Sequence, residues 1–424
     1  MAAHLPAGPF TCSAAIGPYA RLRLGCARLA RPMTSEASST QAPGRFIIDA
    51  RYVEAKPSGI GRYVEALIQR LPPLAPTQPF ELWTHPTRPH PVTFPNVFCQ
   101  PVAAPADGLR TLLLPQRLGQ LGPEDVIHFP FSLLGRGLRC ATVVTVHDLM
   151  WLEQPELVEG RPLMRRVRQR YYQQGMRWAL RFATRLIAVS EATRERMVAR
   201  LPECEPRIRV THNAADTRFV PAENVETSRE QAAAIIGGSA PYYLVVGKNE
   251  PYKAHEIALA AFAATAREGE RLVFIQRASG GRGLLAQARR LGIAERLRFL
   301  PTVSGDGLIS LLQSAQALLQ PSLLEGFGIP VLEAMACGCP VVTSDTPALL
   351  EVVGGAGLHA AVGDAAAFGA ALTRLRTPGL RADLRQRGLT RAREFSWERT
   401  AQQTLAVYHE AAAEHARRIR TGTA

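Results

Sequence analysis

Lysine is nearly absent from this sequence of 424 residues. Only Lys56, Lys248 and Lys253 are lysine among 50 basic residues, so the other 47 are arginine. A coding bias toward arginine accounts for this excess without any functional meaning. A net charge of +14 nevertheless favours acidic partners, which include nucleotide phosphates, nucleic acid and an anionic membrane surface. Composition alone leaves these partners open.

Long apolar runs are also missing. No stretch of about 18 uninterrupted apolar residues occurs, which argues against a transmembrane helix. Hydrophobic residues make up 46% of the chain and charged residues 20%, as in a soluble globular protein. The length suits two domains of ordinary size.

Cysteine is sparse and unpatterned. The seven cysteines form no CxxC pair, and Cys337 and Cys339 are the closest two. An odd, scattered set argues against a disulfide framework or a zinc site and fits a reduced compartment.

The first 44 residues differ from the rest. They carry four arginines and no acidic residue before Glu36. A transit peptide has this composition, and so does upstream translation with Met33 as the true start. A secretory signal fits less well, because no clear apolar core is present. We expect residues 1–44 to be a poorly ordered extension.

Short apolar runs alternate with helical patterns through the first half. The run 46–48 predicts a buried strand, and a helical pattern begins near Tyr63. The loop between them contains Pro57, Gly59 and Gly61. Further strands are predicted at 126–127, 143–146 and 186–189, and helices at 161–182 and 191–200. Strands separated by helices indicate a parallel α/β sheet.

A polar stretch at 213–241 interrupts this rhythm, and we interpret it as a linker with one short helix. The rhythm then restarts. Strands are predicted at 242–246, 272–275, 297–300, 316–320 and 340–343, and helices at 254–267, 282–291, 305–314 and 330–337. The layout predicts an α/β fold of two doubly wound domains, 45–215 and 241–395, facing across a cleft. Residues 216–240 join them, and a final helix spans 396–417. Ligands of such sheets bind at the carboxyl ends of the strands.

The segment from Glu325 to Glu333 is the most informative. A strand ends at Gln320, and a loop with Gly326 and Gly328 follows. Glycine lets backbone N–H groups approach a ligand closely, and the helix start behind the loop favours an anion such as a diphosphate.

Two carboxylates bracket this cradle. Glu325 lies in the loop, where it can accept hydrogen bonds from sugar hydroxyls. Pro330 suits the start of the following helix and Gly338 its end, which puts Glu333 in the first helical turn. Its two oxygens can hold the vicinal hydroxyls of a ribose. A surface Glu with a helix-capping Glu is the plain alternative, but it leaves the glycine loop unexplained.

This segment resembles the E-x7-E motif of retaining glycosyltransferases with the GT-B fold, in glycosyltransferase family 4. The likeness extends over PSLLEGFGIPVLEAMACGCPVVTSD. It implies that Glu325 contacts the donor sugar with help from the backbone of Gly326, Phe327 and Gly328. It also implies that Glu333 holds the nucleotide ribose.

The loop GKNEPYKA is similar to the basic family loop that meets the donor diphosphate. The family lysine corresponds to Lys253, and an upstream position, often Arg or Thr in the family, corresponds to Lys248. Lysine is a compact point charge on a flexible stem and suits a phosphate. Two ordinary surface lysines are the alternative.

In the first half, SGIGRYVEAL resembles the family's amino-terminal glycine loop, with Gly59 and Gly61 lining the cleft opposite the donor. VVTVHDL ends a strand with His147, where the family places a histidine that faces the reacting sugar. HNAADTRFVP varies the family's P-N-G-V-D-x-x-x-F-x-P, and His212 in place of Pro puts the loop shape in doubt. His128 and His212 are otherwise interpreted as structural. The closing helix resembles the one that crosses back to the first domain in the family.

The resemblance implies transfer of a hexose from a nucleotide diphosphate sugar to a glycan or lipid-linked acceptor, with retention of configuration. The sequence contains no D-x-D, and GT-B enzymes generally work without a metal, so we expect no metal and no cofactor besides the nucleotide-sugar co-substrate. GDP-mannose and UDP-sugars are both open as donors, with overall likeness to bacterial mannosyltransferases favouring the first.

Residues 161–200 hold eleven arginines and only two acidic residues, Glu191 and Glu195. Four of the arginines cluster at 165–170, beside Leu163, Val167 and Tyr171. This is either a basic amphipathic face for an anionic membrane or lipid-diphosphate acceptor, or a solvated helix. We therefore expect a cytoplasmic protein that can contact the inner face of the plasma membrane.

Three other functions compete. A sugar-nucleotide epimerase shares the architecture, whereas a phosphorylase needs a pyridoxal lysine in a much larger chain. An NAD-dependent dehydrogenase needs a complete GxGxxG with an acid about 20 residues on, and the chain lacks it. The charge permits a nucleic-acid-binding protein, but no nucleic-acid motif is present, and we expect no nucleic-acid partner.

Overall fold

The computed structural model describes residues 44–53, 59–87, 94–113, 115–157, 162–276, 281–301 and 303–422. Lys56, Pro57 and residues 1–43 lie outside this part of the chain, as does the side chain of Leu163. What the sequence predicts for them therefore stays a prediction.

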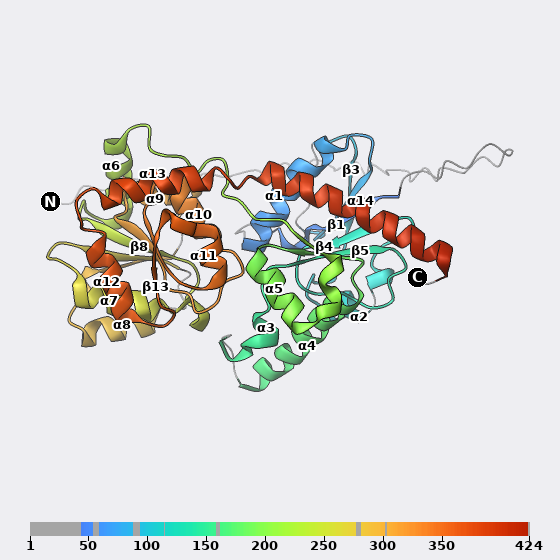
Figure 1. Ribbon diagram of the computed structural model, residues 1–424, viewed down its shortest axis with the longest axis horizontal. Helices are drawn as coiled ribbons and strands as arrows, with labels where there is room; N and C mark the ends of the chain where they lie inside the picture. Colours follow the sequence, from blue (N-terminus) through green and yellow to red (C-terminus); the bar gives the residue numbers. More distant parts are fainter. Residues whose placement is uncertain are drawn as a thin grey trace, which may run out of the picture. The chain divides into compact units, whose positions relative to one another are not determined.

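The first sheet contains seven parallel strands within the described residues, in the order β3-β2-β1-β4-β5-β6-β7 (Figure 1). Its strands are β1 Phe46–Asp49, β2 Phe80–Thr84, β3 Val97–Pro101, β4 Val126–Phe129, β5 Ala141–Val146, β6 Arg185–Ala188 and β7 Ile208–Val210. Its helices are α1 Gly59–Leu74, α2 Leu109–Leu113, α3 Met150–Glu153, α4 Pro162–Phe182 and α5 Glu191–Arg200. We call this part the first domain.

The second sheet contains six parallel strands within the described residues, in the order β10-β9-β8-β11-β12-β13. Its strands are β8 Tyr242–Val246, β9 Arg271–Ile275, β10 Leu297–Leu300, β11 Ala317–Gln320, β12 Val341–Ser344 and β13 Leu358–Ala360. Its helices are α6 Val225–Ile236, α7 His255–Thr265, α8 Gly281–Arg290, α9 Gly305–Ser314, α10 Ile329–Ala336, α11 Pro347–Val353, α12 Ala365–Arg374 and α13 Leu380–Ala392. We call this part the second domain.

Central strands of both sheets are buried along their whole length. Every residue of β5 and of β11 is inaccessible to solvent or nearly so, because helices cover both faces of the sheet. Parallel strands in such a setting are near-continuous apolar runs. This is why the short runs of the sequence predict these strands well.

Strand order fixes where a ligand can bind. In the first sheet the order reverses between β1 and β4, and in the second between β8 and β11. At such a point the loops after two neighbouring strands diverge to opposite faces and leave a crevice at their carboxyl ends. The loops that carry Lys253 and Glu325 follow β8 and β11.

Helix α14, Trp397–Thr421, returns from the second domain to the first (Figure 1). Trp397, Ala401 and Tyr408 lie in one apolar core with Phe46 and Tyr63. The Tyr408 hydroxyl also lies 2.7 Å from Nδ1 of the buried His128, which pins the helix to β4. The predicted crossing helix is therefore confirmed, and it extends a turn beyond residue 417.

Nine strands and helices of the described residues are absent from the sequence prediction. Strands β3, β7 and β13 are short or lie at sheet edges, where apolar alternation is weak, and β2 carries the charged Glu81 within a buried strand. Helices α2, α3, α11, α12 and α13 were not predicted either. The division at 216–240 stays a proposal, but α6 lies inside that stretch, and its Ala232 and Ile236 pack in the core of the second domain.

Within the described residues, no helix combines the length and the apolar character that a membrane span requires.

Candidate active site

Two loops meet at the crevice of the second sheet. One follows β8 and ends in the 3₁₀ turn Pro251–Lys253. The other runs from Pro321 to the start of α10. The backbone N–H of Leu323 donates to the carbonyl of Tyr252 at 2.7 Å, so the two loops are joined directly.

Lys253 and Glu325 form a buried ion pair between these loops. The Lys253 Nζ lies 2.5 Å from Glu325 Oε1, and the exposed fractions of the two side chains are 15% and 9%. Gln320 Nε2 and Ser322 Oγ each donate to the same oxygen at 2.8 Å. All three donors therefore bind the same oxygen, Oε1.

Lys253 carries its positive charge at neutral pH. Burial by itself would lower the pKa of Lys253, but the Glu325 carboxylate outweighs burial and the pKa is raised. Lys248 is placed differently, because its side chain is half exposed and pairs with Glu250. The structure therefore brings Lys253 to Glu325 but leaves Lys248 at the rim.

The glycine loop leads directly into α10. Gly328 has φ +106° and is followed by Ile329 and Pro330 at the helix start, and Gly338 has φ +73° just after its end. Both positive φ values favour glycine. The predicted helix with its proline start and glycine end is thus observed.

The sequence predicts that Glu333 lies in the first turn of α10. In the structure it is the fifth residue of this helix. The prediction is wrong because α10 already begins at Ile329. The Glu333 side chain is 2% exposed and bonds to the guanidinium of Arg62 in the first domain. Burial outweighs Arg62 and raises the pKa of Glu333 to about 7. It therefore caps no helix and faces the first domain.

Gly326 is in close van der Waals contact with the first domain, and a side chain at this position would not fit. A Cβ atom at this position would lie 1.6 Å from the backbone oxygen of His147. Ser190 Oγ donates to the Gly326 carbonyl at 2.7 Å, and Thr193 Oγ1 donates to it at 3.2 Å. Only glycine fits here, because any side chain would collide with the other domain.

His147 comes directly after β5 and is half-buried. Its Nε2 lies 2.9 Å from the carbonyl oxygen of Pro130, which can only accept, so Nε2 bears the proton. Burial lowers the pKa of His147 to about 4. The ring is therefore neutral at neutral pH, and the Tyr63 ring packs edge-on against it at 5.0 Å.

Two residues at this junction, Asp148 and Arg62, are not among the predicted site residues. Asp148 is half-buried and its Oδ1 accepts from the Met150 N–H at 3.0 Å. Burial raises the pKa of Asp148 against the opposing effects of this bond and of the Lys253 charge. The structure places Gly61 and Arg62 in the first turn of α1 and not in a loop, as the sequence predicts for the glycines, and Arg62 reaches Glu333 from there. Gly61 is buried and Gly59 begins α1. A basic residue after the glycines was the available signal for Arg62.

The described residues contain no group of three or more His, Cys, Asp or Glu side chains placed to hold a metal ion. A cavity of about 620 Å³ lies elsewhere, between α6, α13 and the amino ends of β8, β11 and β12. It is at the opposite edge of the second sheet from the ion pair. We place the candidate site at the crevice because the buried charges converge there.

Known proteins match both domains. Residues 57–219 match the family described as Glycosyltransferase Family 4, and residues 227–391 match Glycosyl transferases group 1. The D-inositol 3-phosphate glycosyltransferase of Acidothermus cellulolyticus is 32% identical over 72% of this chain and 71% of that protein. The chain belongs to glycosyltransferase family 4.

Two further similarities fit this family. The O-antigen chain mannosyltransferase B of Escherichia coli is 33% identical over 67% of this chain and 74% of that protein. The structure of Alr3699/HepE from Anabaena in complex with UDP and glucose matches with a TM-score of 0.63 at 18% identity, over 85% of this chain and 98% of that one. The predicted family and the predicted fold class of two facing doubly wound domains are confirmed.

A substitution at the domain contact tests this site. Gly326→Ala places a methyl group against the His147 carbonyl, so the domains of this glycosyltransferase cannot approach as observed. Transfer activity should fall by about 100-fold, as for misplacement of reacting groups by about 1 Å. Gly355→Ala is the matched control, because a Cβ there meets nothing within 4 Å. Equal activity of the two variants would contradict the assigned contact.

Proposed function

We propose that this glycosyltransferase moves a hexose from a nucleotide diphosphate sugar to a hydroxyl of a glycan or lipid-linked acceptor. The observation that carries the proposal is the buried Lys253–Glu325 pair beside the glycine loop, at the carboxyl ends of β8 and β11. A carboxylate and a cation buried together at a crevice suit a ligand that offers both hydroxyls and an anion.

The donor then lies along the second domain. Its diphosphate binds near Lys253 and the start of α10, where the helix dipole adds to the lysine charge. Lys248, at the rim, meets the diphosphate from the solvent side. The transferred sugar bonds to Glu325 and to the backbone of the glycine loop.

The ribose binds Glu333, and this requires an exchange. Arg62 occupies the Glu333 carboxylate in the structure, so the ribose hydroxyls must displace its guanidinium. Arg62 then becomes available to the diphosphate beside it. Gly59 and Gly61 allow the first turn of α1 to approach the donor closely.

The reaction breaks the bond between the anomeric carbon and the phosphate oxygen, and it forms a bond from that carbon to the acceptor oxygen. Negative charge develops on the leaving diphosphate, and Lys253 with the backbone N–H groups of the glycine loop stabilises it. The acceptor proton passes to the leaving phosphate oxygen on the same face, so configuration is retained. The neutral His147 faces the reacting sugar, and no metal or cofactor takes part.

Donor and acceptor have different degrees of support. The mannosyltransferase relative favours GDP-mannose, and the UDP complex of the Anabaena protein favours a UDP-sugar. The relative named for D-inositol 3-phosphate adds a phosphorylated cyclitol to the acceptor classes. The arginine-rich first domain suits any of these acidic acceptors.

A panel of nucleotide sugars tests the function. We expect one of these nucleotide sugars, and the corresponding nucleoside diphosphate, to raise the melting temperature of the protein. In the presence of EDTA, the sugar of that donor should be transferred or slowly hydrolysed with retention of its anomeric configuration. Glu325→Gln should lower the rate by about 100-fold. Glu410→Gln is the control, because Glu410 pairs with Arg185 and Arg209 away from the crevice.

The proposal would be contradicted if neither a nucleotide sugar nor a nucleoside diphosphate raised the melting temperature of the protein. Interconversion of the nucleotide sugar without any acceptor would favour an epimerase. Nucleic-acid binding that survives Glu325→Ala would favour a nucleic-acid-binding protein.

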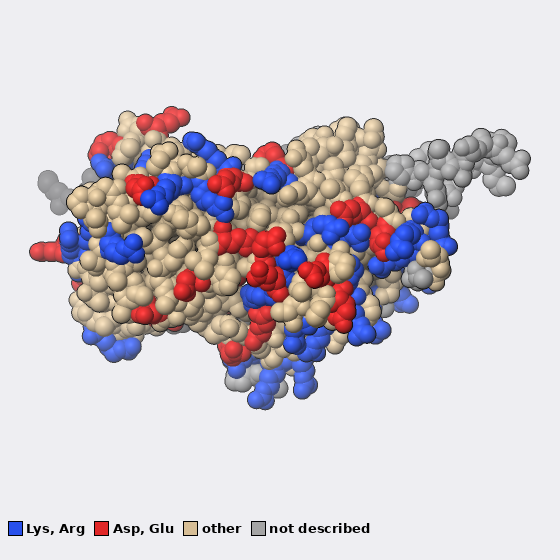
Figure 2. Space-filling model, viewed as in Figure 1, with Lys and Arg blue, Asp and Glu red and all other residues tan. Residues whose placement is uncertain are grey.

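We further propose a cytoplasmic enzyme that contacts the inner face of the plasma membrane through α4. Helix α4 carries six arginines and no acidic residue, and Figure 2 shows basic side chains projecting where Figure 1 draws this helix. Val167 and Phe182 are each 56% exposed. Basic and apolar side chains on one exposed helix suit an anionic lipid surface.

Vesicles test this contact. The enzyme should bind vesicles that contain phosphatidylglycerol, and binding should fall as salt rises, because each basic residue near the surface contributes about 1 kcal/mol. Arg166→Gln with Arg170→Gln should weaken binding more than Arg374→Gln with Arg381→Gln in the second domain. Binding that ignores lipid charge and salt would contradict the membrane contact.

A further inference from the structure

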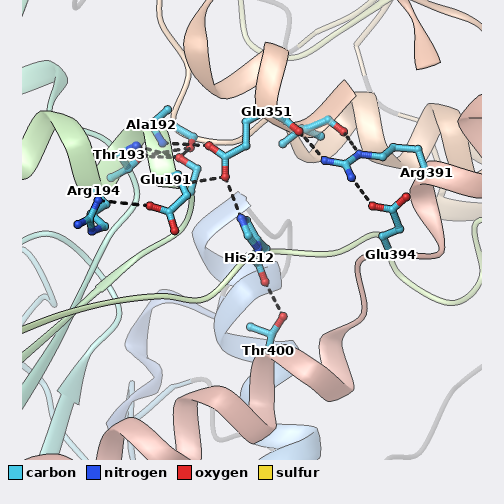
Figure 3. Close-up of polar contacts among 12 residues, drawn as sticks. Glu191, Ala192, Thr193, Arg194, His212, Glu351, Arg391, Glu394 and Thr400 are labelled. Atoms are coloured by element: carbon cyan, nitrogen blue, oxygen red, sulfur yellow. Dashed lines mark hydrogen bonds and ion pairs between the residues drawn. The ribbon is translucent and has the colours of Figure 1, made fainter. Parts of the chain in front are cut away.

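The amino terminus of α5 in the first domain is completed by a carboxylate of the second domain (Figure 3). Glu351, in α11, accepts from the backbone N–H of Glu191 at 2.8 Å and from that of Ala192 at 2.9 Å. These are the first two residues of α5, whose N–H groups have no partner within the helix. A carboxylate at a helix amino terminus is stabilised by both the N–H groups and the helix dipole.

The same helix turn holds the donor-binding glycine loop. Ser190, the residue before α5, accepts from the Thr193 N–H at 3.0 Å and donates from its hydroxyl to the Gly326 carbonyl. Thr193 donates to that carbonyl as well. Ser190 and Thr193 are completely buried or nearly so. One turn of α5 thus binds the second domain twice, through Glu351 and through Gly326.

His212 adds a third bond to Glu351. Its Nε2 lies 2.8 Å from Glu351 Oε1, so this nitrogen donates. The backbone oxygen of His212 accepts from Thr400 Oγ1 of α14 at 2.5 Å, and its ring packs against Phe327 and Phe395. The chain just after β7, which leads toward the second domain, is therefore tied to the same carboxylate.

Glu351 is itself held rigidly from its own domain. Arg391 donates to the backbone oxygen of Glu351 at 2.6 Å and to that of Val352 at 3.1 Å, as Figure 3 shows for the first of these. Burial would raise the pKa of Glu351, but the hydrogen bonds from His212 and the two N–H groups outweigh it and lower the pKa. The side chain is a carboxylate at neutral pH.

We infer that Glu351 is a positioning residue, which latches the second domain onto α5 and thereby sets the glycine loop against His147. The latch rests on the proposed function, since it deepens how that donor site is assembled. Opening of the domains would break the hydrogen bonds from the Glu191 and Ala192 N–H groups to Glu351. At the same time it would break the hydrogen bonds of the α5 hydroxyls to the Gly326 carbonyl. Glu351 touches neither Lys253 nor Glu325, so it acts on closure and not on nucleotide contacts.

The test replaces the charge while keeping the shape. In Glu351→Gln the side-chain NH2 group replaces one of the two accepting oxygens. It therefore faces the backbone N–H of Glu191 or Ala192, which is also a donor, and at least one hydrogen bond to α5 is lost. We expect kcat for transfer to fall by about 10- to 100-fold, with the Kd of the nucleoside diphosphate changed by less than about 3-fold. Hydrogen exchange at the N–H groups of residues 191 and 192 should become faster.

Glu270→Gln is the matched control. Glu270 is also a largely buried carboxylate of the second domain, and it accepts from the Arg267 N–H and from Arg376, each at 2.8 Å. Its replacement should lower the melting temperature to a similar extent and leave kcat and exchange at 191 and 192 unchanged. A merely structural role of Glu351 predicts identical behaviour of the two variants, and that result would overturn the latch.

Thr193→Val provides a second variant if Glu351→Gln fails to fold. It removes one donor to the Gly326 carbonyl and keeps the Glu351 bonds, so kcat should fall about 3- to 10-fold while residues 191 and 192 stay protected. An unchanged kcat would overturn the inference. If the wild-type protein neither binds nucleoside diphosphates nor transfers sugar, the proposed function fails, and the exchange comparison still decides the latch.

Discussion

The buried pair of Lys253 and Glu325 is the interaction on which the rest of the site depends. Either charge alone would be strongly disfavoured at this depth, so each requires the other, and both require β8 and β11 to be neighbours. The pairing of β8 with β11 brings Lys253 and Glu325 together from sequence positions 72 residues apart. Gln320 and Ser322 complete the pair, because both donate to the carboxylate oxygen that also binds Lys253.

Closure of the two domains follows from a second constraint. The glycine loop is bonded through Gly326 to Ser190 and Thr193, and it leaves no space for a side chain beside His147. The ion pair thus sits in the second domain, while the geometry around it is set by the first. An enzyme that must exclude water from a reacting sugar and then release its products needs such contacts to form and break together.

The sequence predicts the parts of this arrangement that are local. A strand, a glycine loop and a proline-started helix form one continuous signal, which locates Glu325 and the loop, and a lysine in an arginine-rich chain locates Lys253. Contacts between distant segments leave no such signal. Arg62 binds Glu333, which lies 271 positions further along the chain. In the sequence nothing distinguishes Glu351 from other helix residues, because its contact with α5 exists only in the folded protein. The short edge strands β7 and β13 were missed because three residues carry too little periodicity.

A crystal structure of the protein with a bound nucleoside diphosphate tests the central claim most directly. We predict the ribose hydroxyls on the Glu333 carboxylate in place of Arg62, with the diphosphate between Lys253 and the start of α10. A nucleotide that leaves the Arg62–Glu333 pair intact and binds elsewhere, for example in the cavity beside α6 and α13, would contradict the assignment of the donor site.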